Sequence, residues 1–238
     1  MLDQIIAVTL WLHIGAGFTA FFVAPVTLIT RKGGGTHRRW GKVYFWAMAV
    51  ATLSSLVVAA YRPNLFLFLI GIFSFYLAFT GYRVLARKRP EQGQKATALD
   101  WSVTTITLLS SLAMIVWGAT HLLNGPMSLN PVLFVFGILG AFSAGSDMKA
   151  YLWPSPDKNA WYFNHMAGMV ASYIAAVSAF AVVNLIFLPP LVRWLGPTAI
   201  GVPLLSLWIR SYRNKFNQGV KPMEVAIVRD KVLMNEAA

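Results

Sequence analysis

The chain contains only four histidines, and they are the side chains best suited to chemistry in a sequence that has no cysteine. A neutral imidazole is a common ligand of zinc, iron and haem. The lack of thiols excludes disulfides, thiolate ligands and cysteine catalysis. Each histidine lies in or beside a long apolar segment, where an ionisable side chain indicates function. They are His13, His37, His121 and His165.

Two imidazoles from different helices at one membrane depth can ligate a single haem iron. The apolar segments place His13 and His121 toward one side of the membrane, and His37 and His165 toward the other. Our preferred interpretation is therefore two stacked haem b sites that carry electrons across the bilayer. Arginines near the membrane surface would neutralise the haem propionates, here Arg38 and Arg39.

A second interpretation is an inner zinc or iron site that activates water for hydrolysis. Its ligands would be His37, His165, Asp100 and Asp147, all on the same side, although the sequence has no HExxH or HxxxH pair. Both aspartates also have an ordinary explanation. Asp100 begins a helix, where the helix dipole favours a carboxylate, and Asp147 can pair with a neighbouring cation at the membrane surface.

A third interpretation is binding without catalysis, of a lipid, a quinone or another small molecule. The segment "WLGPTAIGVP" from Trp194 to Pro203 has glycine and proline inside an apolar run. Such residues either break a helix beside a cavity or only kink it, and both outcomes stay open.

The segments that position these residues are long and apolar. Of the 238 residues, 57% are hydrophobic and 12% are charged, and the apolar runs have the length of about 20 residues that spans a bilayer as a helix. The sequence thus predicts an all-α, polytopic membrane protein, a bundle of seven transmembrane helices. The expected spans are Gln4–Thr30, Trp40–Tyr61, Leu65–Leu85, Thr97–His121, Pro131–Tyr151, Ala160–Ile186 and Leu191–Arg210.

The basic residues predict the orientation of this bundle. Of the 20 lysines and arginines, 18 flank the spans on one side, and only Arg62 and Arg193 fall on the other. Because cytoplasmic loops carry the excess of basic residues, the N-terminus is expected outside and the C-terminus in the cytoplasm. We expect residues 1–210 to form one transmembrane domain and residues 211–238 a short basic cytoplasmic tail. The N-terminus lacks the basic start of a signal peptide and is interpreted as a retained first helix.

Polar and small residues recur along one face of the predicted fourth span. Their spacings alternate between four and three residues, which keeps them on one side of a helix. Small residues at this spacing usually let two helices approach closely, and similar faces on the first, fifth and sixth spans indicate that the histidines and Asp147 point into the bundle. The residues of this face are Asp100, Thr104, Thr107, Ser111, Met114, Gly118 and His121.

Several functions lack support in the sequence. The formal net charge of +12 sits at the ends of apolar runs and not along one soluble face, so nucleic acid is not an expected partner. The chain has no Walker loop and no GxSxG motif, and the glycines of "KGGG" follow no strand. No internal repeat suggests a repeat-built transporter.

The segment "LHIGAGFTAFFVAPVTLITRKGGGTHRRWGKVYFWAM" resembles the start of an uncharacterised bacterial family of multi-pass membrane proteins. The later segments "HMAGMVASYIAAVSAFAVVN" and "WLGPTAIGVP" are also similar to that family, which has no established activity to carry over. The resemblance implies the bacterial inner membrane. Histidines near the ends of apolar helices are similar, by analogy, to transmembrane b-type cytochromes. The matching positions are His13, Lys32, Gly33, Gly34, His37, Arg38, Gly41, Tyr44, His165 and Asn184.

Overall fold

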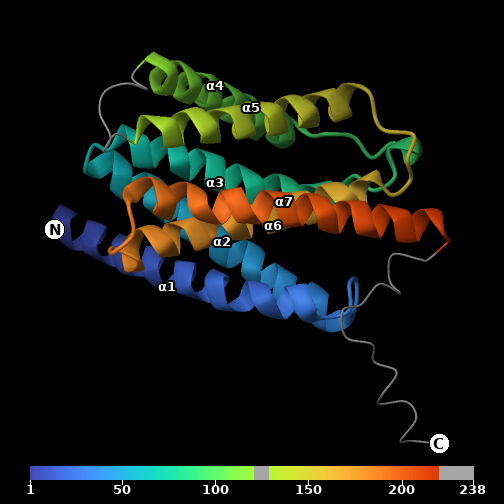
Figure 1. Ribbon diagram of the computed structural model, residues 1–238, viewed down its shortest axis with the longest axis horizontal. Coiled ribbons are helices and arrows are strands. Elements are labelled where there is room, and N and C mark those ends of the chain that lie inside the picture. The colour runs from blue at the N-terminus through green and yellow to red at the C-terminus, as the bar shows by residue number, and fades with distance from the viewer. Residues whose placement is uncertain (121–128, 220–238) are drawn as a thin grey trace, which may run out of the picture.

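The computed structural model describes residues 1–120 and 129–219 of the chain. In this part, seven helices are long and apolar enough to cross a membrane, and no residue is in a strand (Figure 1). The predicted all-α, seven-span architecture is therefore confirmed. The helices are α1 (Leu2–Ile29), α2 (Gly35–Tyr61), α3 (Leu65–Arg83), α4 (Ala98–Thr120), α5 (Asn130–Leu152), α6 (Ala160–Asn184) and α7 (Pro190–Asn217), with short 3-10 turns η1 (Val84–Ala86) and η2 (Pro90–Gln92) between α3 and α4.

Large apolar side chains cover the outside of the bundle. Trp11 is 72% exposed, Phe142 is 75% exposed and Val183 is 72% exposed. In a lipid bilayer such surfaces need no further cover, because helices satisfy their own backbone hydrogen bonds and present apolar side chains to the lipid. The chain is an integral membrane protein.

Two helices differ clearly from their predicted bounds, while the others agree to within about two residues at each end. α2 begins at Gly35, five residues before the expected Trp40, so His37 lies in the first turn of a helix and not in a loop. α7 continues to Asn217, beyond the expected end at Arg210, and it is unbroken at Pro197 and Pro203. The helix break considered for "WLGPTAIGVP" is absent, since a helix in lipid keeps its remaining backbone hydrogen bonds around a proline.

α3 connects the two halves of the bundle. It packs against α2, α4 and α6, while α1 lies on α2, α5 lies on α4, and α7 lies on α6. Figure 1 shows α4 and α5 on one side of α3, and α1 and α2 on the other. Residues far apart in the sequence, on α2, α3 and α6, are thereby brought together.

The predicted polar face of α4 points into the bundle. Within the described part, its six members from Asp100 to Gly118 are all buried, and His121 lies outside the described residues. A Cβ added at Gly118 would lie 2.6 Å from the backbone nitrogen of Phe134, and one added at Gly137 would lie 2.8 Å from the carbonyl oxygen of Ser111. The middle of this face therefore serves close packing of α4 on α5.

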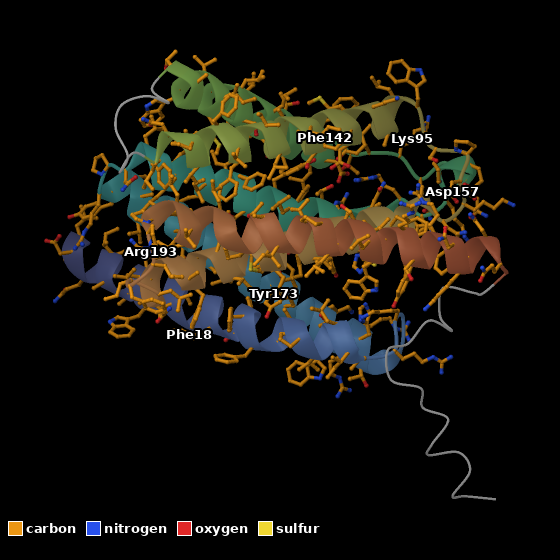
Figure 2. All side chains as sticks on the ribbon, viewed as in Figure 1. Phe18, Lys95, Phe142, Asp157, Tyr173 and Arg193 are labelled. Carbon is orange, nitrogen blue, oxygen red and sulfur yellow. The ribbon has the colours of Figure 1, made fainter. Side chains whose placement is uncertain are left out.

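The basic connections meet at one end of the bundle. The α1–α2, α3–α4 and α5–α6 connections and the end of α7 lie there, and we call it the basic end. Figure 2 shows Lys95 and Asp157 at this end and Arg193 at the opposite one. The charge bias predicts that the basic end is cytoplasmic.

Candidate functional site

A cavity of about 1290 Å³ opens at the basic end, and we call it the basic cavity. Its walls come from the end of α1, the start of α2, the α3–α4 and α5–α6 connections, α6 and α7. Nine lysines and arginines line it, against three acidic residues, Glu91, Asp147 and Asp157. Apolar and aromatic side chains such as Met166, Tyr173 and Trp208 complete the lining. The site suits a ligand with an apolar body and negative charge.

His37 and His165 both line the basic cavity. The centres of their rings are 6.3 Å apart, and the ring planes are inclined at 80°. His37 comes from the first turn of α2 and His165 from the second turn of α6. The two histidines that the sequence places at one membrane depth are thus neighbours in space.

Both imidazoles form a hydrogen bond to the backbone through the same ring atom, Nδ1. Nδ1 of His37 is 3.1 Å from the carbonyl oxygen of Thr27, and Nδ1 of His165 is 2.7 Å from that of Gly81. A carbonyl oxygen only accepts, so each Nδ1 donates its proton, and in the neutral ring Nε2 keeps its lone pair. In the described part of the chain neither Nε2 has a hydrogen-bond partner. Metal-ligating histidines are typically oriented in this way.

The position of His165 depends on a close helix crossing. A Cβ added at Gly168 would lie 2.5 Å from the Cα of Gly81 and 3.0 Å from the carbonyl oxygen of Leu77. Only two glycines allow α3 and α6 to approach this closely. The crossing brings the Gly81 carbonyl within reach of the imidazole one turn earlier on α6.

Lys32 also lines the basic cavity, although only 8% of its surface is exposed. Its Nζ donates to the carbonyl oxygens of Thr27 at 2.9 Å and Leu28 at 2.5 Å, at the end of α1. The ammonium also lies 5.6 Å from the centre of the Trp208 ring on α7. Burial lowers the pKa of Lys32 from 10.5 to about 8. From the sequence, Lys32 is explained by the excess of basic residues on the cytoplasmic side alone. Nothing in the sequence indicates that the side chain is buried.

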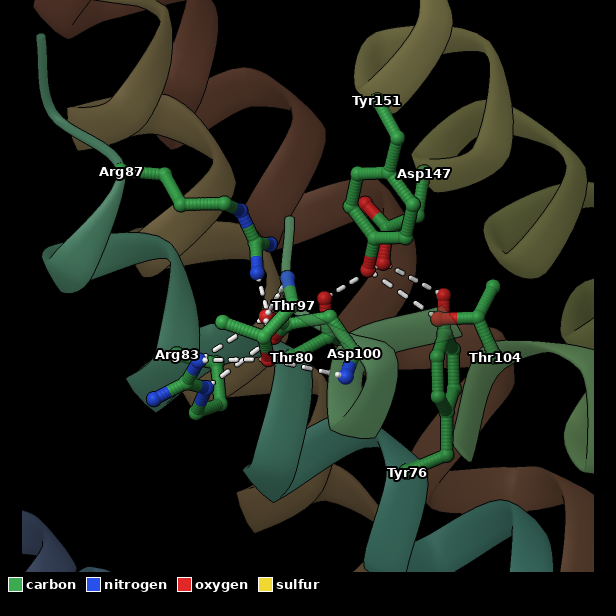
Figure 3. Close-up of polar contacts among 9 residues, drawn as sticks. All are labelled: Tyr76, Thr80, Arg83, Arg87, Thr97, Asp100, Thr104, Asp147 and Tyr151. Carbon is green, nitrogen blue, oxygen red and sulfur yellow. Dashed lines mark hydrogen bonds and ion pairs between the residues drawn. The ribbon is translucent and has the colours of Figure 1, made fainter. Parts of the chain in front are cut away.

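Asp100 belongs to a structural ion network and not to the cavity (Figure 3). Its fully buried carboxylate accepts from Arg83 at 2.8 Å and from Arg87, and it also accepts the backbone N–H of Thr97 at 2.8 Å. The Thr97 hydroxyl in turn accepts the Asp100 backbone N–H at 3.4 Å, which is a capping arrangement at the start of α4. The ordinary explanation of Asp100 as a helix-start carboxylate is correct, and two arginines extend it.

Asp147 has a different environment. Its Oδ2 accepts from the hydroxyl of Tyr76 at 2.5 Å and from that of Thr80 (Figure 3). Beside it, the hydroxyls of Tyr151 and Thr104 are 3.0 Å apart. In the described residues Asp147 has no ion pair, so the expected pairing with a neighbouring cation is not found. Sequence spacing could not identify Tyr76 and Thr80, because they lie on another helix.

The remaining candidate residues are distributed as follows. Arg38 lines the basic cavity, and Arg39 is exposed and does not line it. His13 lies on α1 outside the cavity, with Nδ1 2.7 Å from the carbonyl oxygen of Ala51 on α2. His121, its expected partner, lies outside the described residues.

The four residues of the alternative metal site are engaged separately. Asp100 is held by arginines, Asp147 by hydroxyls, and only the two histidines are in ring contact. Across residues 1–120 and 129–219, no group of three or more histidines and acids could hold a metal ion. What the site offers is a pair of imidazoles in a basic, partly apolar cavity.

One comparison with known proteins gives a result. Residues 10–142 match the model of a family described as "Predicted membrane protein (DUF2306)". The match begins at residue 10 within α1 and ends at residue 142 near the middle of α5, so it includes His13 and His37 but not His165. No curated protein and no solved structure matches the chain.

Proposed function

We propose that this chain, which belongs to the DUF2306 family of membrane proteins, binds haem b between His37 and His165 and acts as a one-electron carrier. The observation that carries the proposal is the contact of these two rings inside the basic cavity. Two imidazoles on one haem iron are a common arrangement for electron transfer.

The separation of the rings is compatible with a shared metal. With metal–nitrogen bonds of about 2 Å, His37 and His165 would be near enough to hold one metal between them.

The size and charge of the basic cavity support the same ligand. Its volume of about 1290 Å³ exceeds the ~300–1,000 Å³ typical of small-molecule pockets. The excess of basic side chains would neutralise two propionates, with Arg38 in the lining as one candidate. When bound, haem would supply one-electron chemistry, and the chain would supply the imidazoles, the charge and a partly dry environment.

Transmembrane electron transfer is the extension of this proposal. It requires a second haem near the opposite end of the bundle, with His13 and His121 as ligands. The hydrogen bond from His13 to Ala51 orients that imidazole in the same way as the two in the basic cavity. The expected location is the inner membrane of a bacterium.

The test is an absorption spectrum of the purified protein, expressed with sufficient haem. We expect a Soret band that shifts on reduction with dithionite. H37A and H165A are each expected to lose the band of the basic-cavity haem. The matched control is N164A, because Asn164 lines the cavity beside His165 and has no ligand role. The haem content per chain distinguishes a protein with one haem site from a protein with two. H13A should remove only the haem of the second site.

Other outcomes select the alternatives. A colourless protein with stoichiometric zinc would overturn the haem proposal in favour of a metal-dependent hydrolase. A colourless protein without metal would favour binding of a quinone, a lipid or another small molecule. Unchanged spectra in both H37A and H165A would show that haem binds elsewhere.

A further inference from the structure

The buried ammonium group of Lys32 has no carboxylate partner in the part of the chain that the structure describes. The two ion pairs found there both use Asp100. A buried charge without a counter-ion is costly, since carbonyl dipoles and an aromatic face replace only part of its hydration. A buried ammonium of this kind belongs either to a structural lysine or to a binding site for an anion.

We propose that Lys32 binds the acidic group of the ligand of the basic cavity. This ligand is an amphiphile with a carboxylate or phosphate on an apolar body. The inference concerns the cavity of the proposed function and names the ligand chemistry there. Binding of an acidic amphiphile by Lys32 does not require iron, so this proposal and the haem proposal can be refuted separately.

The hydrogen bonds of Lys32 leave capacity for this role. An ammonium has three N–H donors, and two of them are used by the carbonyls of Thr27 and Leu28. The third donor and the remaining charge are available at the cavity wall, of which Lys32 is part. The negative end of the α1 dipole holds the lysine in place, and Trp208 covers it from α7.

The chain next to Lys32 also favours an anion. Gly33 has a positive φ of 75°, which folds the chain back so that α2 starts directly after Lys32. The N-cap residue Gly34 provides no side-chain hydrogen bond, and the first-turn N–H groups of α2 carry the positive end of its dipole. His37 lies in that same turn and lines the cavity.

The charge balance of the whole cavity points the same way. Nine basic side chains face three acidic ones, so a bound anion gains from many cations while only Lys32 is buried. The other lysines that line the cavity, including Lys42, are exposed and keep their hydration. Lys32 should therefore contribute more to anion affinity than any exposed lysine.

The first test uses probes that contain no metal. Binding of oleate, oleyl phosphate and neutral oleyl alcohol to the purified protein is measured by scintillation proximity with radiolabelled probes. At pH 7, K32Q should weaken binding of both acidic probes by about tenfold or more and leave oleyl alcohol unchanged. K32R should keep most of the preference for acids. K42Q, which removes an exposed lysine of the same cavity, is the matched control and should weaken binding of the acidic probes far less than K32Q.

The three probes and inorganic phosphate distinguish the possible sources of the acidic group. Tighter binding of oleyl phosphate than oleate would assign a phosphate headgroup, and the reverse a carboxylate. Competition by millimolar inorganic phosphate alone would assign free phosphate and overturn the amphiphile. Equal losses for K32Q and K42Q, or equal binding of oleate and oleyl alcohol by the wild type, would overturn the role of Lys32.

The pH dependence provides a second readout. Because the pKa of Lys32 is lowered to about 8, the preference of the wild type for oleate over oleyl alcohol should decline as the pH rises from 7 to about 9. Arg31, Arg38, His37 and His165, the other ionisable groups beside Lys32, are the same in wild type and K32Q, so a difference between the two profiles reports on Lys32 itself. K32Q should show no such decline, and a K32Q profile like that of the wild type would contradict the proposal.

A third measurement separates the two proposals. Haem and its uncharged dimethyl ester are compared for wild type, K32Q and K42Q. If haem binds and only K32Q loses the preference for the free acid, both proposals stand. If haem binds and K32Q keeps the preference for the free acid, the role of Lys32 is refuted and the haem proposal stands. Failure to bind haem, together with Lys32-dependent binding of oleate, would refute the function and leave the inference.

Discussion

Nδ1 of His165 donates to the carbonyl oxygen of Gly81 over 2.7 Å, at the point where α6 crosses α3. The crossing is close because Gly81 and Gly168 face each other without side chains. A candidate ligand is thus oriented by the backbone of another helix, and its position depends on two glycines that bear no functional group.

Enlarging Gly168 should damage both packing and the site. The new methyl group of G168A would lie 2.5 Å from the Gly81 Cα, which is backbone and cannot rotate away. We expect a loss of about 1–3 kcal/mol in the free energy of unfolding and weaker ligand binding in the basic cavity. The measurement is an SDS titration together with ligand binding.

The control is G145A, because a Cβ at Gly145 on α5 meets no atom within 4 Å. This variant should be unchanged or slightly more stable, by about 0.5–1 kcal/mol. Equal behaviour of G168A and G145A would show that the crossing is not close in solution.

Asp100 should be essential for stability. D100N keeps the shape of the side chain but leaves Arg83 and Arg87 without a negative partner in the network. Because breaking a buried ion pair from one side leaves uncompensated charge, the expected loss is about 3–5 kcal/mol or failure to accumulate. The comparison is D157N, which removes an exposed carboxylate and should have little effect on thermal stability.

Asp147 should tolerate an amide but not an apolar side chain. D147N keeps an oxygen that can accept from Tyr76 and Thr80, so we expect a small change in stability. D147L leaves the fully buried Tyr76 hydroxyl without its acceptor, at a cost of about 1–3 kcal/mol. Thermal stability of the two variants in the same detergent measures the difference, and a D147N loss as large as that of D147L would mean that the negative charge itself is required.

Lys32 should make the stability of the ligand-free protein rise at alkaline pH. Its pKa is lowered from 10.5 to about 8 on folding, so between these values the unfolded chain binds a proton that the folded chain has released. Stability must therefore increase as the pH rises through this window, and below about pH 8 the full cost of the buried charge is present. Thermal unfolding from pH 7 to 9.5 should show this rise in wild type and K42Q and a flatter profile in K32Q.

The basic end is predicted to face the cytoplasm. The chain has no cysteine, so single cysteines can report accessibility without background. K95C in the connection before α4 and P63C in the α2–α3 connection lie at opposite ends of the bundle. In intact cells an impermeant thiol reagent should label P63C and not K95C, and in inside-out vesicles the reverse. The opposite pattern would invert the topology.

The sequence by itself determined the seven spans, the clustering of charge at one end and the buried face of α4. These features depend on the length and periodicity of single segments, because a bilayer requires about 20 apolar residues per helix and a helix repeats its faces every 3.6 residues. The same reasoning placed His37 and His165 at one depth. It could not show that their rings are 6.3 Å apart or which carbonyls hold them.

Only the tertiary structure decided which polar groups meet. Asp100 and Asp147 look alike as carboxylates near the basic end, yet one is neutralised by two arginines and the other bonds only to hydroxyls of α3. Lys32 looks like an ordinary basic residue after a transmembrane helix, yet Trp208 of α7 covers it. Partners of this kind come from helices distant in the sequence, and their meeting is set by how the helices cross, which close contacts such as Gly81 with Gly168 define.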